Sequence, residues 1–408
     1  MDVLATLRDA KYLDDPYPLY AQVREQRAVR TPRDGIALAR HSDVTAVLGD
    51  ARFAKVLLPR VPFGAASVLS RMFLFLDPPD HTRLRRVVAP AFSQSSVAAM
   101  RADIETIAQS LVPPTATSVD LVGDFAYPLP FAVVARLLGI PDDDRAQLAQ
   151  WSRTLTESLD SPPPVKLRDL PRGIAAIMRR ESHPVAAVRA STAIVPYAQR
   201  RIAVSKAAPI TPLCETLVRG IADGEINDDE AAATWVMMAI AGHETTANLI
   251  GNSVLALLEQ PDVLEQLNAD PTLVPRAVDE CLRYDTPVPH TPRVAHDDVA
   301  FGDVTIRRGE VALLLLTAAN RDPDAFPDPD RLELTRPKTP PHVGFAHGIH
   351  FCVGAALARL EVEAALTTML PRIAVEAERP SPVRRPTVAV RGLTEFVLPL
   401  KAGDPRKG

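Results

Sequence analysis

A cysteine flanked by glycines and aromatic residues is the position at which this sequence most strongly indicates chemistry. The stretch around it contains, in order, Phe345, Gly348, Phe351, Cys352 and Gly354. A strongly helical run follows, so the cysteine is expected in a loop at a helix N-terminus. Free amides and the helix dipole favour the thiolate form of the sulfur there. A thiolate in such a loop can ligate a metal ion or act as a nucleophile.

Two other interpretations of Cys352 are open at this point. Most lone cysteines are small buried apolar residues, and a nucleophilic cysteine could pair with His347 or His350. Neither interpretation accounts for glycines and rings at this spacing. Gly348 and Gly354 would let the backbone turn tightly and approach a flat ligand closely, while the two phenylalanines could shield the sulfur from water. His350 could donate a hydrogen bond to an anionic group nearby.

A second group of polar residues lies in the middle of an apolar helical pattern. The pattern runs from Asn227, which forms a capping-box signature with Glu230, to Gln260, and residues 241–246 within it read Ala-Gly-His-Glu-Thr-Thr. A mid-helix glycine costs about 1 kcal/mol, and a local kink with a threonine bonded to the preceding turn would explain only part of this segment. Such a kink would leave His243 and Glu244 unexplained.

A carboxylate and an arginine at helical spacing mark a further segment. Glu280 and Arg283 share one face of a helix predicted over residues 273–284, with Thr272 as its N-cap and Pro275 in its first turn. Taken alone, a Glu-x-x-Arg pair is usually a solvated surface pair. Its interest comes from its place between the polar helix segment and the cysteine.

A basic helical stretch lies earlier in the chain, in residues 75–86. His81 and Arg85 are four residues apart and would project from one helix face toward an anion. A buried anion needs cationic or hydrogen-bonding partners of this kind. Arg83 and Arg86 are interpreted as solvated charges on the same helix.

The elements that must position these residues are mainly helical. A helix is predicted over residues 353–369, while residues 35–39 and 299–316 are predicted to form short strands around turns. In residues 150–215, eight prolines leave only short windows for helices. No linker or repeat divides the chain, so a single domain over residues 1–408 is expected, mainly α with a minor β region.

Composition places the protein among ordinary globular chains. Hydrophobic residues make up 47% of the 408 residues, and 46 Lys and Arg against 50 Asp and Glu give a formal net charge of −4, which offers no argument for nucleic-acid binding. Three cysteines argue against a disulfide framework and fit a reducing compartment. The N-terminus has no signal-peptide pattern, and no apolar stretch reaches about 18 residues, so a cytoplasmic protein without a membrane span is expected.

The spacing Phe-x-x-Gly-x-x-x-Cys-x-Gly resembles the haem-binding signature of the cytochrome P450 family. Phe345, Gly348, Cys352 and Gly354 match this signature, while Ala346 stands where glycine is common in the family. The resemblance implies that Cys352 is the axial ligand of the iron of haem b (heme b, iron protoporphyrin IX). Electron donation from that thiolate promotes O–O cleavage.

Residues 241–246 resemble the oxygen-activation motif of the same family. The resemblance implies catalytic roles for Thr245, which would hydrogen-bond dioxygen or an ordered water, and for Glu244, which would relay protons from solvent. Ala241 and Gly242 would lie at the haem, with Gly242 leaving room for oxygen. The histidine and the second threonine of the segment are assigned structural roles.

The resemblance also gives the charged residues their roles. Glu280 and Arg283 match a pair that is buried in the family, and they are assigned to structure and haem seating. Four residues would contact the haem propionates: His81, Arg85, Arg293 and His350. The resemblance extends over about residues 10–400 and implies a helical, prism-like cytochrome P450 fold with a small sheet region.

The function implied by the resemblance is that of a monooxygenase. It would insert oxygen from O₂ into an apolar small molecule, by hydroxylation or epoxidation, in bacterial secondary metabolism such as antibiotic biosynthesis. The residues predicted to line the substrate pocket are apolar: Met72, Phe73, Leu74, Met238, Ala241, Val288 and Pro289.

The electrons for such a reaction are expected from outside the chain. No Gly-x-Gly-x-x-Gly follows a predicted strand, so no flavin or nicotinamide domain is indicated, and a ferredoxin with its ferredoxin reductase is expected to reduce a monomeric enzyme. His347 and Arg359 flank the cysteine loop and could form part of a basic docking face.

Other functions on the same scaffold stay open from the sequence. The protein could act as a peroxygenase, a coupling enzyme or an isomerase, or as a non-catalytic haem sensor. Glu244 with Thr245 favours the O₂ route, because peroxide users often lack this pair. The intact Cys352 and its predicted propionate partners argue against a haem-free protein.

Overall fold

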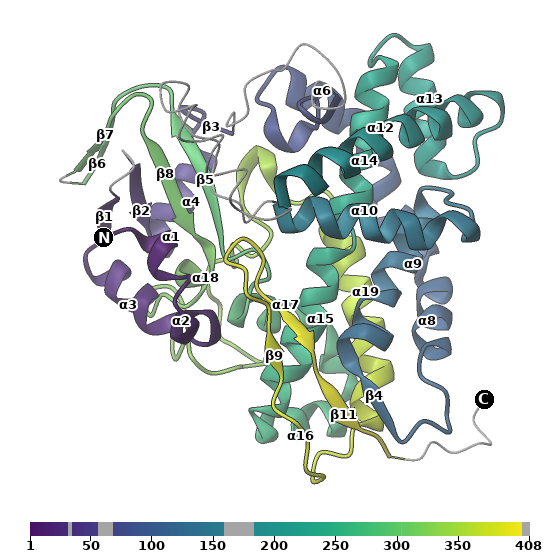
Figure 1. Ribbon diagram of the computed structural model, residues 1–408. Coiled ribbons are helices and arrows are strands. Elements are labelled where there is room, and N and C mark those ends of the chain that lie inside the picture. The colour runs from purple at the N-terminus through teal and green to yellow at the C-terminus, as the bar shows by residue number, and fades with distance from the viewer. Residues whose placement is uncertain (32–34, 56–67, 159–182, 303, 402–408) are drawn as a thin grey trace. The chain divides into compact units, whose positions relative to one another are not determined.

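The computed structural model describes residues 1–31, 35–55, 68–158, 183–302 and 304–401 (Figure 1). The chain divides into two compact units: unit 1 comprises Met1–Leu57, Ala89–Val133 and Thr245–Gly408, and unit 2 comprises Leu58–Val88 and Val134–Glu244. Helix predominates, and the described strands all belong to unit 1. The predicted fold class, mainly α with a minor β region, is confirmed.

Unit 1 contains a mixed five-stranded sheet. Its strands stand in the order β1 (Ala28–Thr31), β2 (Gly35–Leu38), β8 (Val311–Leu315), β5 (His290–Ala295) and β3 (Phe53–Ala54). Strands β2 and β8 pair in parallel, whereas the other neighbours are antiparallel. The strands predicted in residues 35–39 and 299–316 are confirmed.

Both faces of this sheet are covered, because alternate residues of a strand point to opposite sides. Ile36 and Leu314 pack with α4 (His41–Gly49) on one face. Ala37 and Leu313 pack on the other face with three N-terminal helices: α1 (Val3–Thr6), α2 (Ala10–Asp14) and α3 (Tyr17–Glu25). Burial on both faces explains why β8 is a continuous apolar run rather than an alternating one.

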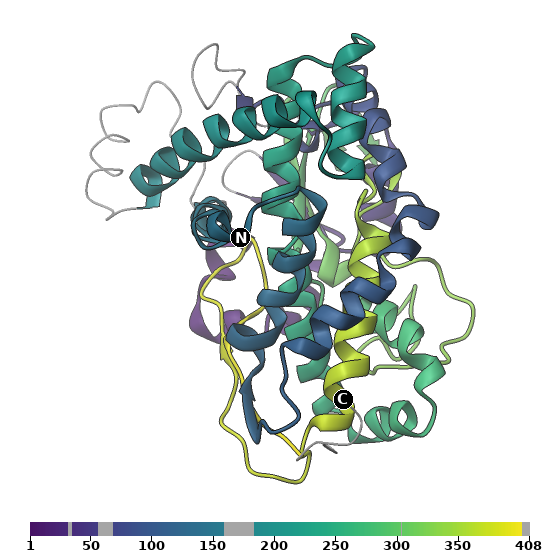
Figure 2. The same cartoon turned by 90° about the vertical axis from the view of Figure 1, so that its right-hand side faces the viewer.

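The rest of unit 1 consists of helices and short strand pairs. The helices are α7 (Gln94–Ala99), α8 (Arg101–Ser110), α15 (Glu244–Leu258), α16 (Pro261–Ala269), α17 (Val274–Tyr284), α18 (Leu316–Asn320) and α19 (Ala355–Met369). The strand pairs are β4 (Ser118–Asp120) with β11 (Val397–Pro399), β6 (Val299–Phe301) with β7 (Val304–Ile306), and β9 (Val383–Arg384) with β10 (Leu393–Glu395). Helix α19 contacts α8 and α17, and α8 and α19 lie side by side in Figure 2.

Helices α17 and α19 confirm the predictions over residues 273–284 and 353–369, within two residues at their starts. The predicted N-cap of α17 is wrong, because Leu273 occupies that position. Thr272 lies in a one-turn 3-10 helix, where both its amide and its hydroxyl bond to Asp270 Oδ1, at 3.0 and 2.5 Å. The Thr272 hydroxyl therefore bonds to Asp270 and is not free to cap α17.

Unit 2 is built of helices. It contains α6 (Asp80–Val88), α10 (Arg145–Ser158), α12 (His183–Ala207), α13 (Pro212–Ala222) and α14 (Asp228–Ala241), and α9 (Pro128–Leu137) runs into it from unit 1. Helix α12 packs on α10, α13 and α14. The predicted capping box starts α14: Asn227 Oδ1 accepts the Glu230 amide at 3.0 Å, and Glu230 Oε2 accepts the Asn227 amide at 2.9 Å.

The continuous helix predicted over residues 227–260 is interrupted. Helix α14 ends at Ala241 and α15 begins at Glu244, with Gly242 and His243 in a turn between them. Glycine is the weakest helix former after proline, and the His243 side chain bonds to the backbone of the preceding turn. These two local effects end the first helix although the apolar pattern continues.

Helix α12 corrects the expectation of short helices in residues 150–215. It is 25 residues long and contains Pro196 in its interior. Pro184 lies in its first turn, where a missing amide costs little. The bond lost at Pro196 is offset by packing against three other helices. The prolines at 162–164 and 171 lie outside the described residues. Neither α12 nor any other helix in the described ranges has the length and apolarity to span a membrane.

A buried polar cluster joins the two ends of the chain within unit 1. Asp285 accepts hydrogen bonds from Arg391 Nε at 2.7 Å and from the Tyr17 hydroxyl at 3.0 Å. Arg391 also donates to the carbonyls of Leu13 and Asp14, at 2.7 and 2.9 Å. Burial raises the pKa of Asp285, but the neighbouring arginines outweigh burial and hold it below its usual value. The N-terminal helices are therefore fixed by a residue near the C-terminus.

Candidate functional site

Cys352 lies in a tight loop that leads into α19. Its backbone amide donates to the carbonyl of Phe345 at 3.0 Å, and a single 3-10 turn, Gly348–His350, lies between the two. Helix α19 begins at Ala355 with Gly354 as its N-cap. The predicted placement of the cysteine in a loop before a helix N-terminus is confirmed.

Cys352 is exposed, whereas Cys214 and Cys281 are buried. Burial raises the pKa of Cys281 to about 12, so this thiol stays protonated and is a poor ligand for a metal. Because Cys352 is exposed, its interpretation as a small buried apolar residue is wrong. The exposed thiol is the one available for ligation.

The backbone around the cysteine makes close approaches that depend on glycine. Gly348 has a φ of +71°, and a Cβ there would lie 2.5 Å from the carbonyl oxygen of Leu48. Ala346 has a φ of +60°, a left-handed conformation that is strained for any residue with a Cβ. A Cβ on Gly354 would lie 4.0 Å from Cys352 Sγ, an ordinary van der Waals distance, so this contact does not require glycine at position 354.

The two phenylalanines of the loop differ in burial. Phe345 is buried and its ring meets that of Phe351 edge-on, with 6.1 Å between centroids. Phe351 is 40% exposed, and Ile349 and Cys352 beside it are exposed as well. Phe345 is therefore an inner ring of the loop and Phe351 an outer one, and shielding of the sulfur by both rings stays a prediction.

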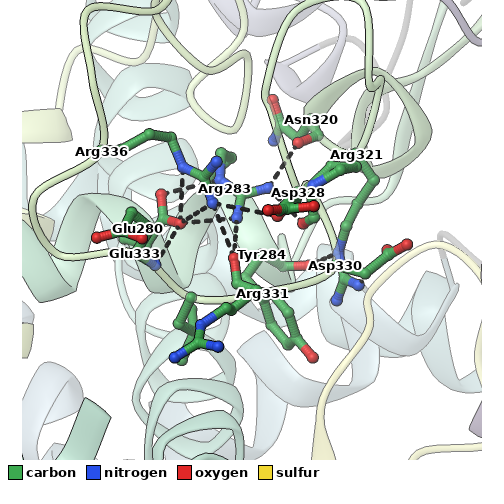
Figure 3. A network of polar contacts seen from close by, with 12 residues as sticks. Glu280, Arg283, Tyr284, Asn320, Arg321, Asp328, Asp330, Arg331, Glu333 and Arg336 are labelled. Carbon is green, nitrogen blue, oxygen red and sulfur yellow. Dashed lines mark hydrogen bonds and ion pairs between the residues drawn. The ribbon is translucent and has the colours of Figure 1, made fainter.

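The Glu280–Arg283 pair is buried and bidentate (Figure 3). Arg283 Nε donates to Glu280 Oε2 at 2.8 Å, and Nη2 donates to Oε1 at 2.7 Å. The remaining N–H groups of Arg283 donate to the carbonyls of Asn320, Pro329 and Arg331, at 2.9, 2.8 and 3.0 Å. The alternative of a solvated surface pair is excluded, and the pair joins α17 to the loop that follows α18.

Arg336 belongs to the same network and was not singled out from the sequence (Figure 3). Its Nε and Nη2 donate to Glu280 Oε1 at 3.1 and 2.8 Å, and the Glu333 amide donates to that oxygen at 2.9 Å. Burial raises the pKa of Glu280, but Arg283 and Arg336 outweigh burial and hold it below its usual value. Arg336 is 56 residues from Glu280, so no helical spacing could have linked them.

Arg293, the predicted propionate partner on β5, is buried in unit 1. One of its terminal nitrogens donates to Thr291 Oγ1 at 3.1 Å and to the carbonyl of Pro292 at 2.9 Å. Lys55 Nζ donates to the same Thr291 oxygen at 2.9 Å, a contact that the sequence did not indicate. Two cationic groups thus converge on one hydroxyl, an arrangement suited to a neighbouring anion.

His81 and Arg85 lie on α6 in unit 2, at the predicted helical spacing. His81 is buried and Arg85 is partly buried, and the His81 ring meets Phe73 edge-on with 6.0 Å between centroids. Burial lowers the pKa of His81, and the Arg85 guanidinium lowers it further. The imidazole is therefore neutral at neutral pH and offers an N–H donor.

The solvated role predicted for Arg83 is wrong, whereas that of Arg86 is confirmed. The Arg83 side chain is 31% exposed and that of Arg86 is 67% exposed. Arg83 donates to Glu230 Oε1 at 2.7 Å and Oε2 at 3.0 Å, to the Glu225 carbonyl at 2.6 Å and to Asp80 Oδ1 at 3.1 Å. Within unit 2, Arg83 therefore ties α6 to the first turn of α14.

The predicted oxygen-handling segment lies where α14 ends. Residues 231–239 are buried, but Ala241 is exposed and Gly242 is partly exposed. Glu244 and His243 are buried, with 4.0 Å between Glu244 Oε1 and His243 Nε2. His243 Nδ1 lies 3.0 Å from the Ala239 carbonyl, which places the proton on Nδ1 in the neutral ring and turns Nε2 toward the carboxyl group.

Gly242 has a packing role in the structure. A Cβ on this residue would lie 2.7 Å from the Met238 carbonyl oxygen and 2.7 Å from Val134 Cγ2 on α9. The role of Gly242 in leaving room for dioxygen stays a prediction. Thr245, the next catalytic candidate, is partly buried and is the first residue of unit 1 in α15.

The structure divides the predicted site residues between the two units. Unit 1 holds Thr245, Arg293, Phe345, Gly348, His350, Cys352 and Gly354, and unit 2 holds His81, Arg85, Ala241, Gly242 and Glu244. Of the predicted pocket residues, Met72, Phe73, Met238 and Pro289 are buried, Val288 is partly buried, and Leu74 and Ala241 are exposed. Five of the unit 1 residues lie in the loop of residues 345–354, the cysteine loop. His81 and Arg85 share helix α6.

Comparison with known proteins relates this chain to one family. The sequence model of that family, cytochrome P450, matches residues 30–395. The chain is 38% identical to cytochrome P450 107B1 of Saccharopolyspora erythraea over 97% of each chain, and 36% identical to vitamin D(3) 25-hydroxylase of Pseudonocardia autotrophica over 94% of each chain. A solved structure of P450BioI in complex with hexadec-9Z-enoic acid ligated acyl carrier protein is similar with a TM-score of 0.86 at 32% identity, covering 96% of this chain and 99% of that one.

Proposed function

Because the chain belongs to the cytochrome P450 family, we propose that Cys352 supplies the thiolate ligand of its haem iron. The protein is a haem b-dependent monooxygenase, an oxidoreductase that incorporates one atom of O₂ into its substrate. The observation that carries the assignment of the ligand is the exposed thiol of Cys352 in the loop before α19, since the other two cysteines are buried.

The residues present fit haem b in their chemistry. The loop offers a thiol that the N-terminus of α19 helps to ionise. Arg293 in unit 1 and His81 in unit 2 are buried donors, and a buried donor of this kind is what a carboxylate requires on leaving water. We assign the propionates to His81, Arg85, Arg293 and His350.

Haem b, when bound, supplies the iron at which dioxygen is activated, with electron donation from the thiolate. We propose that the Thr245 hydroxyl and the Glu244 carboxyl hold and pass the protons that this chemistry consumes. Glu244 is buried, so its protons must arrive through neighbouring groups. Glu280, Arg283 and Arg336 serve the site by fixing α17 and the loop that precedes Cys352.

We propose an apolar small molecule as substrate, in bacterial secondary metabolism. One relative is a vitamin D(3) hydroxylase, and the solved structure of another holds a hexadecenoic acid on a carrier protein. These molecules differ in shape and in the way they are presented, but both have long apolar parts. The apolar character of Met72, Phe73 and Met238 supports a ligand of this class.

We propose a ferredoxin and its reductase as electron donors to a monomeric enzyme. The exposed part of the cysteine loop, with His347, Ile349 and Phe351, offers an accessible surface near Cys352 on which such a donor could dock. Arg359, which was predicted to join this face, makes an ion pair with Asp279 at 2.7 Å. Much of its charge is thereby compensated, so the docking face is assigned to the other three residues.

The ligand assignment is tested by spectroscopy of cysteine variants. The purified protein should be red, and its reduced, CO-bound form should show the red-shifted Soret band of a haem-thiolate protein. Cys352→Ser should abolish this band, while Cys214→Ser, at a buried cysteine whose sulfur is 3.8 Å from the Leu138 carbonyl, should keep it. A Cys352→Ser protein with the band intact, or a wild-type protein that cannot be loaded with haem, would contradict the proposal.

The proton roles are tested by the fate of the electrons. With a ligand found by screening small molecules for a shift of the Soret band, Thr245→Ala should bind haem normally but divert reducing equivalents to hydrogen peroxide. Thr246→Ala, at the buried neighbouring hydroxyl, serves as the matched control and should couple like the wild type. Equal coupling in the two variants would contradict the role assigned to Thr245.

A further inference from the structure

Three polar side chains from three segments of unit 1 meet beside the cysteine loop. They are Asp279 on α17, His342 ahead of the loop and Arg359 on α19. Asp279 Oδ1 accepts a hydrogen bond from Arg359 Nε at 2.7 Å and lies 3.3 Å from His342 Nε2. One oxygen of Asp279 on α17 therefore contacts both α19 and the segment that leads into the cysteine loop.

His342 is oriented by both of its ring nitrogens. The Gly344 amide donates to Nδ1 at 3.2 Å, so the proton of the neutral ring is on Nε2, from which it is donated to Asp279. A Cβ on Gly344 would lie 2.8 Å from Leu282 Cγ on α17, so a larger residue there would force the loop or the leucine side chain to shift. The start of the loop is therefore held on α17 by close packing and by the Asp279–His342 contact together.

Arg359 reaches the cysteine through Phe345. The guanidinium carbon lies 4.7 Å from the centroid of the Phe345 ring, a cation–π distance. The carbonyl of Phe345 accepts the amide of Cys352 at 3.0 Å. The ring of His342 also lies beside Phe345, with 6.1 Å between centroids. Both partners of Asp279 thus contact the residue that holds the Cys352 amide.

Asp279 is an anion in this arrangement. Burial raises its pKa, but the hydrogen bonds from His342 and Arg359 outweigh burial and hold it below the usual value. A surface ion pair is usually worth little, and the Asp279 side chain is 46% exposed. What distinguishes this pair is its geometry. Asp279 holds the Arg359 guanidinium against the ring of Phe345, and the carbonyl of Phe345 accepts the Cys352 amide.

We infer that Asp279 is a positioning residue for the iron ligand. It holds Arg359 against Phe345, and through the Phe345 carbonyl it fixes the loop that carries Cys352. The inference rests on the proposed function, because it takes Cys352 as the ligand. Loss of the carboxylate leaves the positive charge of Arg359 uncompensated near the thiolate, and an uncompensated cation favours the reduced iron. It also frees the loop, which favours loss of the thiolate.

The test uses Asp279→Asn in the haem-loaded, full-length protein. This change keeps the shape of the side chain and removes its charge. Haem content should stay at the wild-type level, and the reduction potential should become more positive. The ratio of reduced, CO-bound protein without the red-shifted Soret band to protein with it should rise roughly two- to fivefold, the range expected for loss of a partly exposed ion pair.

Glu363→Gln provides the matched control. Glu363 is also on α19, pairs with Arg101 at 3.0 Å, and loses the same single charge. Its potential and band ratio should equal those of the wild type. An equal shift in both variants would mean that net charge alone moves the potential, and it would overturn the inference.

A double-variant cycle tests whether Asp279 acts through Arg359. In the background of Arg359→Gln, adding Asp279→Asn should change the potential and the band ratio far less than it does in the wild type. An undiminished effect would overturn the inference, and so would an Asp279→Asn protein that unfolds in less urea but has unchanged potential and band ratio. A wild-type protein without haem or without the band would instead show that the proposed function has failed.

Discussion

Glu361 is a carboxyl group buried in α19, and its replacement by glutamine tests what that burial does to the stability of the protein. The residue is 1% exposed, and Oε2 makes no hydrogen bond within the described part of the chain. Burial raises the pKa of this group well above its ordinary value. Helix α19 packs on α8 and α17, so the side chain cannot reach water without a local opening of unit 1.

The size of the effect follows from proton linkage. Below a pH of about 4.3, the ordinary pKa of a glutamate, the carboxyl is protonated in the folded and unfolded chains, and burial costs no ionisation energy. Above that pH the unfolded chain releases the proton while the folded chain keeps it. The free energy of unfolding then falls by about 1.4 kcal/mol per pH unit until the pH reaches the raised pKa of Glu361 in the folded chain. Glu361→Gln is uncharged at every pH and lacks this loss.

Urea unfolding of the haem-loaded protein between pH 5 and 8.5 measures the difference. The variant should gain on the wild type as pH rises, with a slope up to about 1.4 kcal/mol per pH unit. Glu363→Gln is the control, because Glu363 pairs with Arg101 on the same helix and should show no gain that grows with pH. Parallel pH curves for Glu361→Gln and the wild type would refute the reasoning, since they would mean that Glu361 is ionised in the folded protein.

Three further changes test contacts described above, each by urea unfolding. Ala346→Gly should raise the free energy of unfolding by about 0.5–1 kcal/mol, because it relieves the left-handed backbone at φ +60°; a loss would show that the turn is not strained. Arg83→Ala should lower the free energy of unfolding by about 1–3 kcal/mol, and Arg86→Ala by less than about 0.5 kcal/mol. Equal losses would contradict the role of Arg83 in tying α6 to α14. Arg336→Met should cost about 1–3 kcal/mol and speed haem release, because Glu280 keeps only one guanidinium; an unchanged release rate would contradict a role in haem seating.

Features that depend on neighbours along the chain could be predicted from the sequence. The capping box needs only Asn227 and Glu230 three residues apart, and the shared face of Glu280 and Arg283 needs only the helical period. The loop around Cys352 could be located because glycines and a helical run follow one another directly. These signals are local, and the structure follows them within a residue or two.

Features that depend on partners far along the chain could not be predicted. Arg83 meets Glu230 across 147 residues, and Asp279 meets Arg359 across 80 residues, with no periodicity to connect them. Tertiary packing also decided where helices continue. It sustains α12 through Pro196, whereas the apolar pattern through Gly242 did not sustain one helix. Single-residue propensities cannot weigh such packing against local cost.

The cluster around Asp285 has a consequence for the order of events during synthesis. Arg391 is 378 residues from Leu13 and 377 from Asp14, whose carbonyls it binds. At about 5–20 residues per second, a ribosome takes roughly 20–75 s to travel between them. Helices α1 to α3 must therefore leave the ribosome long before the arginine that fixes them exists, and before β8, against which their apolar faces pack, has been made. The contacts that fix this N-terminal part of the protein therefore form only after most of the chain has been synthesised.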